Sequence, residues 1–163
     1  MIAHLGAPSR GMFGGSEFHT QKTGEVGGAS ASIDLDKEAR LRRCELARAH
    51  VLRSAHDISD GGFAVALAES CIAGVRGCRV KLPGDAALPL ASRLFSEEPT
   101  RVIVSFAKEQ LNEVRAICAR HEVPFESIGE VGGETVSIES CLDVSVTELA
   151  EAHHRCLEAI VGS

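Results

Sequence analysis

The chain has 163 residues, of which 44% are apolar and 25% charged, a composition that is ordinary for a folded domain with one sizeable core. A net charge of −6 without a basic stripe, together with the absence of Tyr and Trp, argues against nucleic acid or an anionic membrane as a partner. No apolar run approaches the roughly 20 residues that span a bilayer, and the N-terminus lacks the pattern of a secretion signal.

The first 32 residues differ from the rest of the chain. They hold seven glycines, several Ser and Thr residues and little periodicity, features that are typical of turns and extended chain. Such a segment cannot bury enough apolar surface to order itself in isolation. We therefore predict an extended Gly-rich arm over residues 1–32, followed by a single domain over residues 33–163.

Helix and strand patterns alternate through the predicted domain. An amphipathic helix is predicted over 34–53 with Asp34 or Asp36 as its cap, then a short strand over 54–58 and a mostly apolar, buried helix over 63–74. The remaining pattern predicts helices over 90–94, 108–121 and 146–161 and strands over 78–82, 102–106, 125–130 and 134–139. The β-branched run at 102–106 is typical of a central strand. We expect an α+β fold (α/β/α layers), in which a mixed β-sheet is flanked by helices.

The six cysteines indicate the cellular compartment of the protein and do not indicate a metal or redox site. No two of them form a C-x-x-C pair, so the spacing that is typical of zinc ligands or of a redox motif is absent. Without a secretion signal, we expect reduced thiols and a cytoplasmic protein.

Residues 54–63, with the sequence SAHDISDGGF, carry the clearest functional signal. Gly61 and Gly62 allow backbone N–H groups to approach a ligand closely, and the helix that follows supplies unpaired N–H groups and a positive dipole end. Asp57 and Asp60 could cap that helix or hold Mg²⁺ against a phosphate. Two interpretations stay open on spacing alone, a capped strand-to-helix turn and a nucleotide–metal site.

Three stretches of the chain resemble one family. Residues 13–18, FGGSEF, resemble its "LGGSEY" stretch, residues 54–69 are similar almost letter for letter to "SAHDxSDGGLAVALAE", and LFSE at 94–97 with RVIVS at 101–105 resembles "LFxExxxRxVVS". The family contains phosphoribosylformylglycinamidine synthase, the purine-biosynthesis ligase, and aminoimidazole ribonucleotide synthetase. The resemblance covers nearly the whole chain and is strongest to the C-terminal domain of the second half of the ligase's synthetase subunit.

This resemblance implies a fold, a reaction and partners. The fold would be like the C-terminal domain of aminoimidazole ribonucleotide synthetase. The parent protein would be an ATP-dependent C–N ligase that uses Mg²⁺ and ATP to convert formylglycinamide ribonucleotide and ammonia to the amidine, ADP and phosphate. Its partners would be the missing N-terminal domains of the same chain, a glutaminase subunit and a small bridging subunit. The histidines, lysine and Mg²⁺ ligands of the catalytic half have no matching positions here, so we expect a fragment that is inactive alone and flanks an auxiliary Mg-nucleotide site.

The resemblance also assigns residues to that site. Asp57 matches the position that holds an Mg²⁺-binding Asp in the related half, and it is the one metal ligand that we expect. Asp60, Gly61 and Gly62 match the turn that approaches phosphate. Glu97 matches a Glu that touches substrate in the catalytic half.

Two residues depart from the family pattern. Glu98 and Pro99 stand where Ser or Thr and then Gln are usual, so a negative charge is added and a backbone donor is lost. We therefore expect a nucleotide without turnover at this copy, and no substrate. Two alternatives remain: a non-binding scaffold or docking module of the same enzyme, and the C-terminal domain of aminoimidazole ribonucleotide synthetase or of a related, selenophosphate-type synthetase.

Overall fold

The computed structural model describes residues 1–28, 31–44 and 50–161, with side chains described up to residue 155. Its strands are β1 (Ile2–Gly6), β2 (Leu52–Asp57), β3 (Cys78–Val80), β4 (Arg101–Phe106), β5 (Phe125–Val131), β6 (Thr135–Ile138) and β7 (Leu142–Ser145). Its helices are α1 (Glu17–Thr23), α2 (Leu35–Arg43), α3 (Gly62–Gly74), α4 (Leu90–Phe95), α5 (Leu111–Arg120), which follows a 3-10 turn (Lys108–Gln110), and α6 (Val146–Val161).

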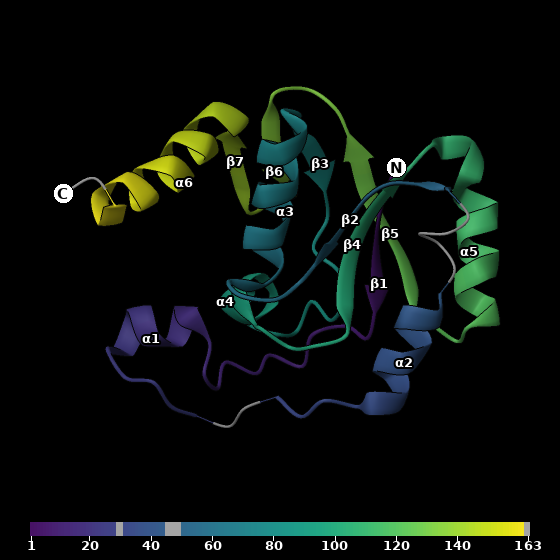
Figure 1. Ribbon diagram of the computed structural model, residues 1–163, viewed down its shortest axis with the longest axis horizontal. Coiled ribbons are helices and arrows are strands. Elements are labelled where there is room, and N and C mark those ends of the chain that lie inside the picture. Colours follow the sequence, from purple (N-terminus) through teal and green to yellow (C-terminus); the bar gives the residue numbers. More distant parts are fainter. Residues whose placement is uncertain (29–30, 45–49, 162–163) are drawn as a thin grey trace.

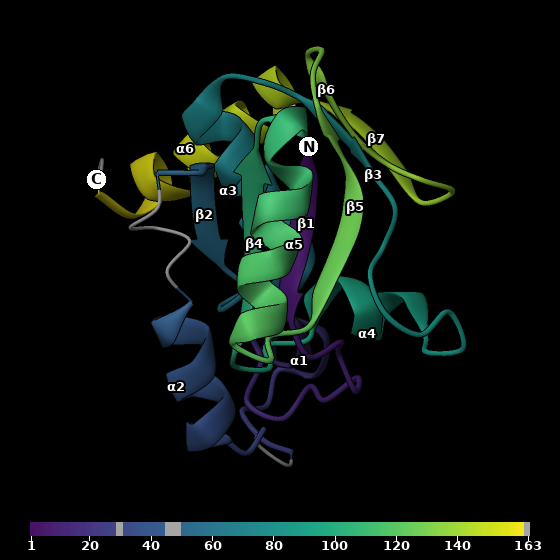
Figure 2. The ribbon, with the colours of Figure 1, turned by 90° about the vertical axis from the view of Figure 1, so that its right-hand side faces the viewer.

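The strands form one mixed seven-stranded sheet in the order β2-β4-β1-β5-β3-β6-β7 (Figure 1). All neighbouring pairs are antiparallel except β3 and β6, which run parallel. Helices cover both faces, with α5 lying across one face (Figure 2) and α3 on the other. The prediction of a mixed sheet between helical layers is therefore confirmed.

Each face of the sheet has its own apolar core. On one face, side chains of α3 and α4, among them Phe63 and Leu67, pack on Ile103 and Ile128 of the sheet. On the other face, α5 packs on β1 and β4, and Leu41 of α2 lies against this second core. Both cores consist mainly of aliphatic side chains, as the scarcity of aromatic residues requires.

Strand β1 is a departure from the predicted arm. Residues 2–6 lie inside the sheet, antiparallel to both β4 and β5, and every one of them is buried. A strand that is covered on both faces shows no apolar–polar alternation, so the run IAHLG gave no period-2 signal. For the residues of the predicted arm that follow β1, the boundary at residue 32 between an arm and a domain stays a prediction.

Residues 7–28 fold back below the sheet (Figure 1). Ser16 begins α1 by accepting a hydrogen bond from the His19 amide at 3.2 Å. Phe18 of α1 stacks between Phe13 and Phe95, with ring centroids 5.3 Å and 4.8 Å apart. These aromatic contacts attach the segment to α4.

Smaller differences concern element ends. The predicted helix over 34–53 is shorter: Asp34 caps α2 as expected, the helix ends at Arg43, and residues 52 and 53 belong to β2. Residues 45–49 of that prediction lie outside the described residues. Strand β7 was not predicted, because its four residues precede α6 without a break and only half-bury two side chains.

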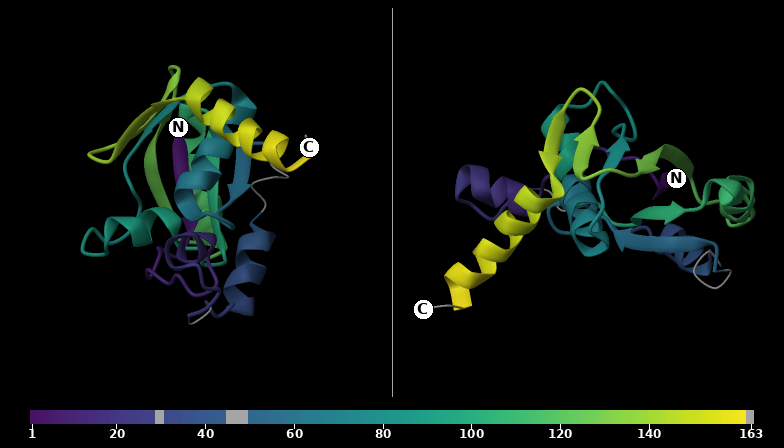
Figure 3. Two further views of the ribbon diagram at one scale, coloured as in Figure 1. Left: turned by 90° about the vertical axis from the view of Figure 1, so that its left-hand side faces the viewer. Right: turned by 90° about the horizontal axis from the view of Figure 1, so that it is seen from above.

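Helix α6 extends the fold at the C-terminal end. Its first turn packs near α3, and its later turns project away from the sheet (Figure 3). None of the described helices combines the length and the apolar character that crossing a bilayer requires.

The start of α3 depends on a close backbone approach. Gly62 has φ +70°, and a Cβ atom there would lie 2.7 Å from the Phe95 carbonyl carbon of α4 and 2.8 Å from the Leu94 oxygen. Gly74, at the other end of the helix, has open space around its Cα. The two glycines therefore offer a matched pair of substitutions.

We predict that Gly62→Ala lowers the free energy of unfolding by about 2–4 kcal/mol, because overpacking and a left-handed backbone at a non-glycine residue each cost roughly 1–3 kcal/mol. Gly74→Ala is expected to change it by less than about 1 kcal/mol. Urea denaturation of both variants measures the difference. Equal stability of the two variants would contradict the close approach.

His4 of β1 predicts a pH dependence. Its side chain is 3% exposed, its Nε2 atom has no partner, and burial together with the nearby Arg101 charge lowers its pKa from 6.5 to about 4, partly offset by Glu126. Between these values the unfolded chain binds the proton and the folded chain does not, so stability rises with pH over this window and is lost as the pH falls.

Wild type should therefore lose about 3 kcal/mol more stability than His4→Leu when the pH falls from 7 to 4, since one pKa unit corresponds to about 1.4 kcal/mol. Urea denaturation across this range gives the comparison. His153→Gln, a change at an exposed position, should follow wild type. The interpretation fails if His4→Leu shows the same pH slope as wild type.

Candidate functional site

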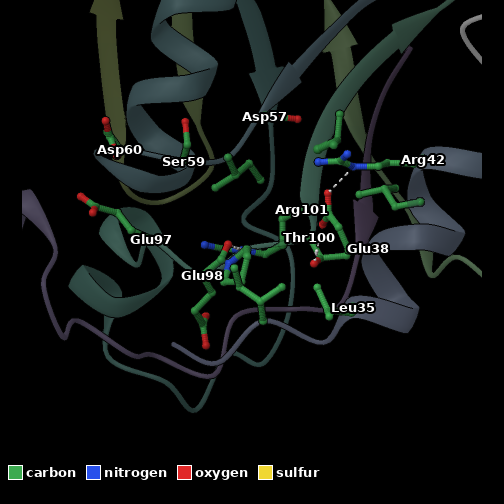
Figure 4. Close-up of a pocket in the computed structure, with 15 residues that line it drawn as sticks. Leu35, Glu38, Arg42, Asp57, Ser59, Asp60, Glu97, Glu98, Thr100 and Arg101 are labelled. Atoms are coloured by element: carbon green, nitrogen blue, oxygen red, sulfur yellow. Dashed lines mark hydrogen bonds and ion pairs between the residues drawn. The ribbon is translucent and has the colours of Figure 1, made fainter. Parts of the chain in front are cut away.

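A cleft of about 440 Å³ opens where β2 ends and β4 begins. Its walls come from three segments: α2 with the residues before it, the β2–α3 turn, and the α4–β4 loop (Figure 4). The lining residues are Ile33, Leu35, Glu38, Leu41, Arg42, Asp57, Ile58, Ser59, Asp60 and 97–102. The cleft therefore brings together three of the five residues that the sequence assigns to the site, with the glycine pair in the adjoining turn.

The β2–α3 turn has its own hydrogen bonds. Gly61 precedes α3 with φ +74°, and its N–H donates to the Glu97 Oε1 atom at 2.8 Å. The Gly62 N–H donates to the Ser59 carbonyl at 3.0 Å. No side chain caps α3, so the orphan amides of its first turn come after Gly62. The two glycine amides that were expected to approach a phosphate thus have protein partners.

Asp57 and Asp60 are the free carboxylates of the turn. Both are exposed, Asp57 at the last position of β2 and Asp60 directly before Gly61. In Figure 4, Asp60 lies beside Glu97 at the start of α3, and Asp57 lies toward the α2 side of the cleft. No hydrogen bond or ion pair within the described residues engages either carboxylate.

The Glu97 carboxylate is engaged by hydrogen bonds within the protein. Its Oε1 atom also accepts the Glu17 N–H at 2.9 Å, so this carboxylate joins the start of α1 to the start of α3. A carboxylate that accepts backbone N–H groups at two helix starts is stabilised by both positive dipole ends. Its observed role is to position the turn.

The negative charge that Glu98 adds to the family pattern is buried and paired within the protein. The Glu98 side chain is 4% exposed, and its oxygens accept the Arg10 N–H at 2.8 and 3.0 Å, with the Arg10 Nε atom at 3.6 Å. The equally buried Arg101 donates from Nε to the Glu98 carbonyl at 3.0 Å and from Nη2 to the Ser96 carbonyl. The Glu98 carboxylate therefore points into the protein, where contacts with Arg10 compensate its negative charge.

The α2 wall supplies residues that the sequence analysis did not assign. Arg42 pairs with Glu38 at 3.1 Å, and Glu38 accepts the Thr100 hydroxyl at 2.8 Å (Figure 4). Arg42 is largely exposed and offers the cleft a cation. Only tertiary packing brings α2 to this place, so the sequence gives no signal for Arg42. Arg101, in contrast, could be noticed in the sequence, because it is the one charged residue at the start of the otherwise mostly apolar run 101–106.

The side chains of the cleft are compatible with an Mg²⁺ ion that is held jointly by the protein and a phosphate. They do not supply enough ligands to hold the ion by protein groups alone. No cluster of three or more His, Cys, Asp or Glu side chains suited to a metal exists in the described ranges. Mg²⁺ is commonly held by one or two carboxylates while phosphate oxygens and water complete its shell. Asp57, with Asp60 nearby in the turn, meets that smaller requirement.

Comparison with known proteins gives the family. Residues 2–140 match the family described as "AIR synthase related protein, C-terminal domain". The chain is 40% identical to phosphoribosylformylglycinamidine synthase subunit PurL of Thermobifida fusca over 99% of its length, and 38% identical to PurL of Caldanaerobacter subterraneus over 80%. It spans only 21% and 18% of these two relatives.

Solved structures show the same fold. The structure described as T. maritima PurL complexed with FGAR is similar with a TM-score of 0.74 at 20% identity, covering 91% of this chain and 27% of that one. Thiamine-monophosphate kinase from Stenotrophomonas maltophilia is similar with a TM-score of 0.57 at 21% identity, over 85% of this chain and 49% of that one.

The resemblance carried by residues 13–18, 54–69 and 94–105 is thus confirmed over most of the chain. The fold, the family match and the identities agree, and the PurL relatives extend well beyond the segment they share with it. The chain belongs to the family of AIR synthase related C-terminal domains, as the C-terminal domain found in PurL proteins.

Proposed function

We propose that this chain serves as the C-terminal domain of a synthetase subunit that converts formylglycinamide ribonucleotide to its amidine with ATP and ammonia in purine biosynthesis, in the cytoplasm. The observation that carries this proposal is the 40% identity to PurL over 99% of the chain. Because the chain spans 21% of that relative, N-terminal domains supply the rest of the enzyme, and the isolated chain has no ligase activity.

The proposal includes the partners of the ligase. A similar solved structure is described as PurLQS from Thermotoga maritima. We take the additional subunits to be a glutaminase that delivers ammonia and a small bridging subunit. In this arrangement the chain is a structural domain of the synthetase subunit and takes no direct part in ammonia release.

The cleft at the start of α3 is the auxiliary Mg-nucleotide site of this proposal. Asp57 is the metal ligand, and Asp60 is the second carboxylate near the phosphates. The uncapped first turn of α3 supplies N–H groups and a positive dipole end. Similar PurL structures are described as complexes with ATP, ADP and AMPPCP, which supports nucleotide binding in this family. Bound Mg²⁺ would neutralise phosphate charge at a predominantly acidic wall.

Gly61, Gly62 and Glu97 shape this site. Gly62 allows α3 to approach α4, and Glu97 fixes the Gly61 amide and the start of α1. Since these groups are already paired, the phosphate contacts of the proposal come from the amides that follow Gly62. The departure at Glu98 and Pro99 leaves no reason to place substrate turnover here.

A scaffold without ligand is the second candidate, and one observation favours it. The amides of Gly61 and Gly62 are satisfied within the protein, so the turn is complete without an anion. In this case the cleft is covered by another domain of the parent protein, and the exposed apolar residues at its edge, Ile33 and Leu35, contact that domain.

The parent function is tested by exchange. We predict that a chimera in which this chain replaces the corresponding C-terminal fifth of the Thermobifida fusca PurL retains ligase turnover within about tenfold of the natural subunit, because the replaced domain is a wall and not the catalytic half. ADP release with formylglycinamide ribonucleotide, ATP and ammonia measures this. A folded chimera that releases no ADP, or ADP release by the isolated chain, would refute the assignment.

The nucleotide site is tested separately with Asp57. Titration of the isolated chain with Mg-ADP should give saturable amide shifts at residues 61–64, and Asp57→Asn should weaken the response at least about tenfold through loss of one metal contact. Glu113→Gln, a change at an exposed carboxylate of α5, is the matched control. If the amides do not respond and the chimera with Asp57→Asn retains as much bound nucleotide as the chimera without it, the scaffold is correct.

A further inference from the structure

A second cavity lies at the opposite end of α3 from the Gly61–Gly62 turn. It has a volume of about 450 Å³ and is bounded by α3, the edge strand β2 and the start of β3. It shares no lining residue with the cleft of the proposed nucleotide site. Among its lining residues are Cys71 and Cys78, which have no part in the proposed function.

The two thiols are in contact. The Cys71 and Cys78 sulfur atoms are 3.6 Å apart, one on α3 and the other on β3. A disulfide requires about 2.05 Å, so bond formation needs a shift of under about 2 Å between the two sulfurs. Cys71 keeps 6% exposure and Cys78 2%, so an incoming reagent meets Cys71 first.

The contact gives the two thiols different reactivities. Hydrogen bonding to the Cys78 thiol lowers the pKa of Cys71, against the opposing effect of burial. The same contact and burial raise the pKa of Cys78. Because Cys71 is the more exposed of the two contacting sulfurs, we assign it as the attacking thiol and Cys78 behind it as the resolving one.

The charges around the cavity favour an anionic reagent. Arg53 and Arg76 line it, and both are exposed. His56 also lines it, and its Nε2 atom is 3.1 Å from the Glu69 carboxylate. Two exposed guanidinium groups at an otherwise mostly apolar cavity attract a small molecule that carries carboxylates.

We propose that Cys71 and Cys78 form a thiol–disulfide exchange site for a small, carboxylate-bearing disulfide of the glutathione type. The Cys71 thiolate attacks one sulfur of the reagent, a mixed disulfide forms, and one small thiolate leaves. The Cys78 thiol then gives up its proton and attacks the Cys71 sulfur, and the second small thiolate leaves. The two cysteines are oxidised to a disulfide, the reagent is reduced to two thiols, and the two protons from the cysteines end on those thiols.

The chain contains an internal comparison for this proposal. Cys118 of α5 is fully buried and hydrogen-bonds to Cys44, and burial together with that contact raises the pKa of Cys118. Neither residue lines the second cavity. Contact between two sulfurs is thus present at both pairs, while the cavity and the cationic residues belong to Cys71 and Cys78.

The experiment exposes the folded full chain to glutathione disulfide and maps the products by mass spectrometry. Wild type should lose two hydrogen atoms and yield a Cys71–Cys78 cross-linked peptide. Cys78→Ala should stop at a glutathione adduct on Cys71, because the resolving thiol is absent. Cys118→Ala, which removes a buried thiol of the other pair, should behave like wild type and form the cross-link at the wild-type rate. Adduct formation on Cys118 should be at least about tenfold slower than on Cys71.

Two results would overturn the proposal. One is a folded wild-type protein in which Cys71 and Cys78 stay reduced while the urea-unfolded chain reacts. The other is a cross-link at Cys44 and Cys118 that forms first. Circular dichroism checks that Cys78→Ala is folded, and if it is not, the wild-type peptide map decides alone.

Discussion

The carboxylate of Glu97 is the contact on which the candidate site depends. One of its oxygens accepts N–H groups from Gly61 and from Glu17, residues that are 36 and 80 positions away in sequence. Through these two bonds the loop after α4 fixes the start of α3 and the start of α1. Gly62 adds to this junction, because only a residue without a side chain lets α3 approach the α4 backbone so closely. The turn that carries Asp57 and Asp60 is thereby positioned by contacts within the protein.

Below this junction, buried charges are compensated within the protein. Glu98 and Arg101 are three residues apart in the sequence. The Glu98 carboxylate accepts the Arg10 N–H and lies 3.6 Å from the Arg10 Nε atom, and its negative charge favours the charged form of Arg101. An uncompensated charge here would be expensive to bury, whereas a paired and hydrogen-bonded one is tolerated. The electrostatics of the open cleft are therefore set by Asp57 and Asp60 on one wall and by the ion pair of Arg42 with Glu38 on the other. An anionic ligand needs a cation on the acidic wall, which is why the nucleotide proposal and the Mg²⁺ proposal stand or fall together.

The sequence was informative where local pattern decides structure. Helices with a clear apolar stripe, such as α5, and the β-branched strand β4 were predicted within a few residues. Strand β1 was missed because a strand buried on both faces has no alternation, and its five residues lie just before a Gly-rich stretch. Helix α1 was missed because it buries no residue and depends on the stacking of Phe18 on Phe95.

The same division holds for the site. A contiguous motif placed Asp57, Asp60 and the glycine pair at one turn, since neighbours in sequence remain neighbours in a tight turn. The motif did not show that Glu97 would accept the Gly61 amide, which is 36 residues away, or that Glu98 would turn inward to accept the Arg10 amide. Arg42 reaches the cleft only through the packing of α2 against β1 and the second core. These contacts are long-range, and no local spacing encodes them.

Helix α3 connects the two chemical features of the chain. Its start borders the acidic cleft, and its end carries Cys71 beside the second cavity. Between them, Phe63, Ala66 and Leu67 are buried in the core, so the helix is held along its length. A cross-link between Cys71 and Cys78 would fasten the far end of this helix to β3 while the Gly62 contact holds the near end to α4. Oxidation at the second cavity would then fix at both ends the helix whose first turn we propose to bind the nucleotide.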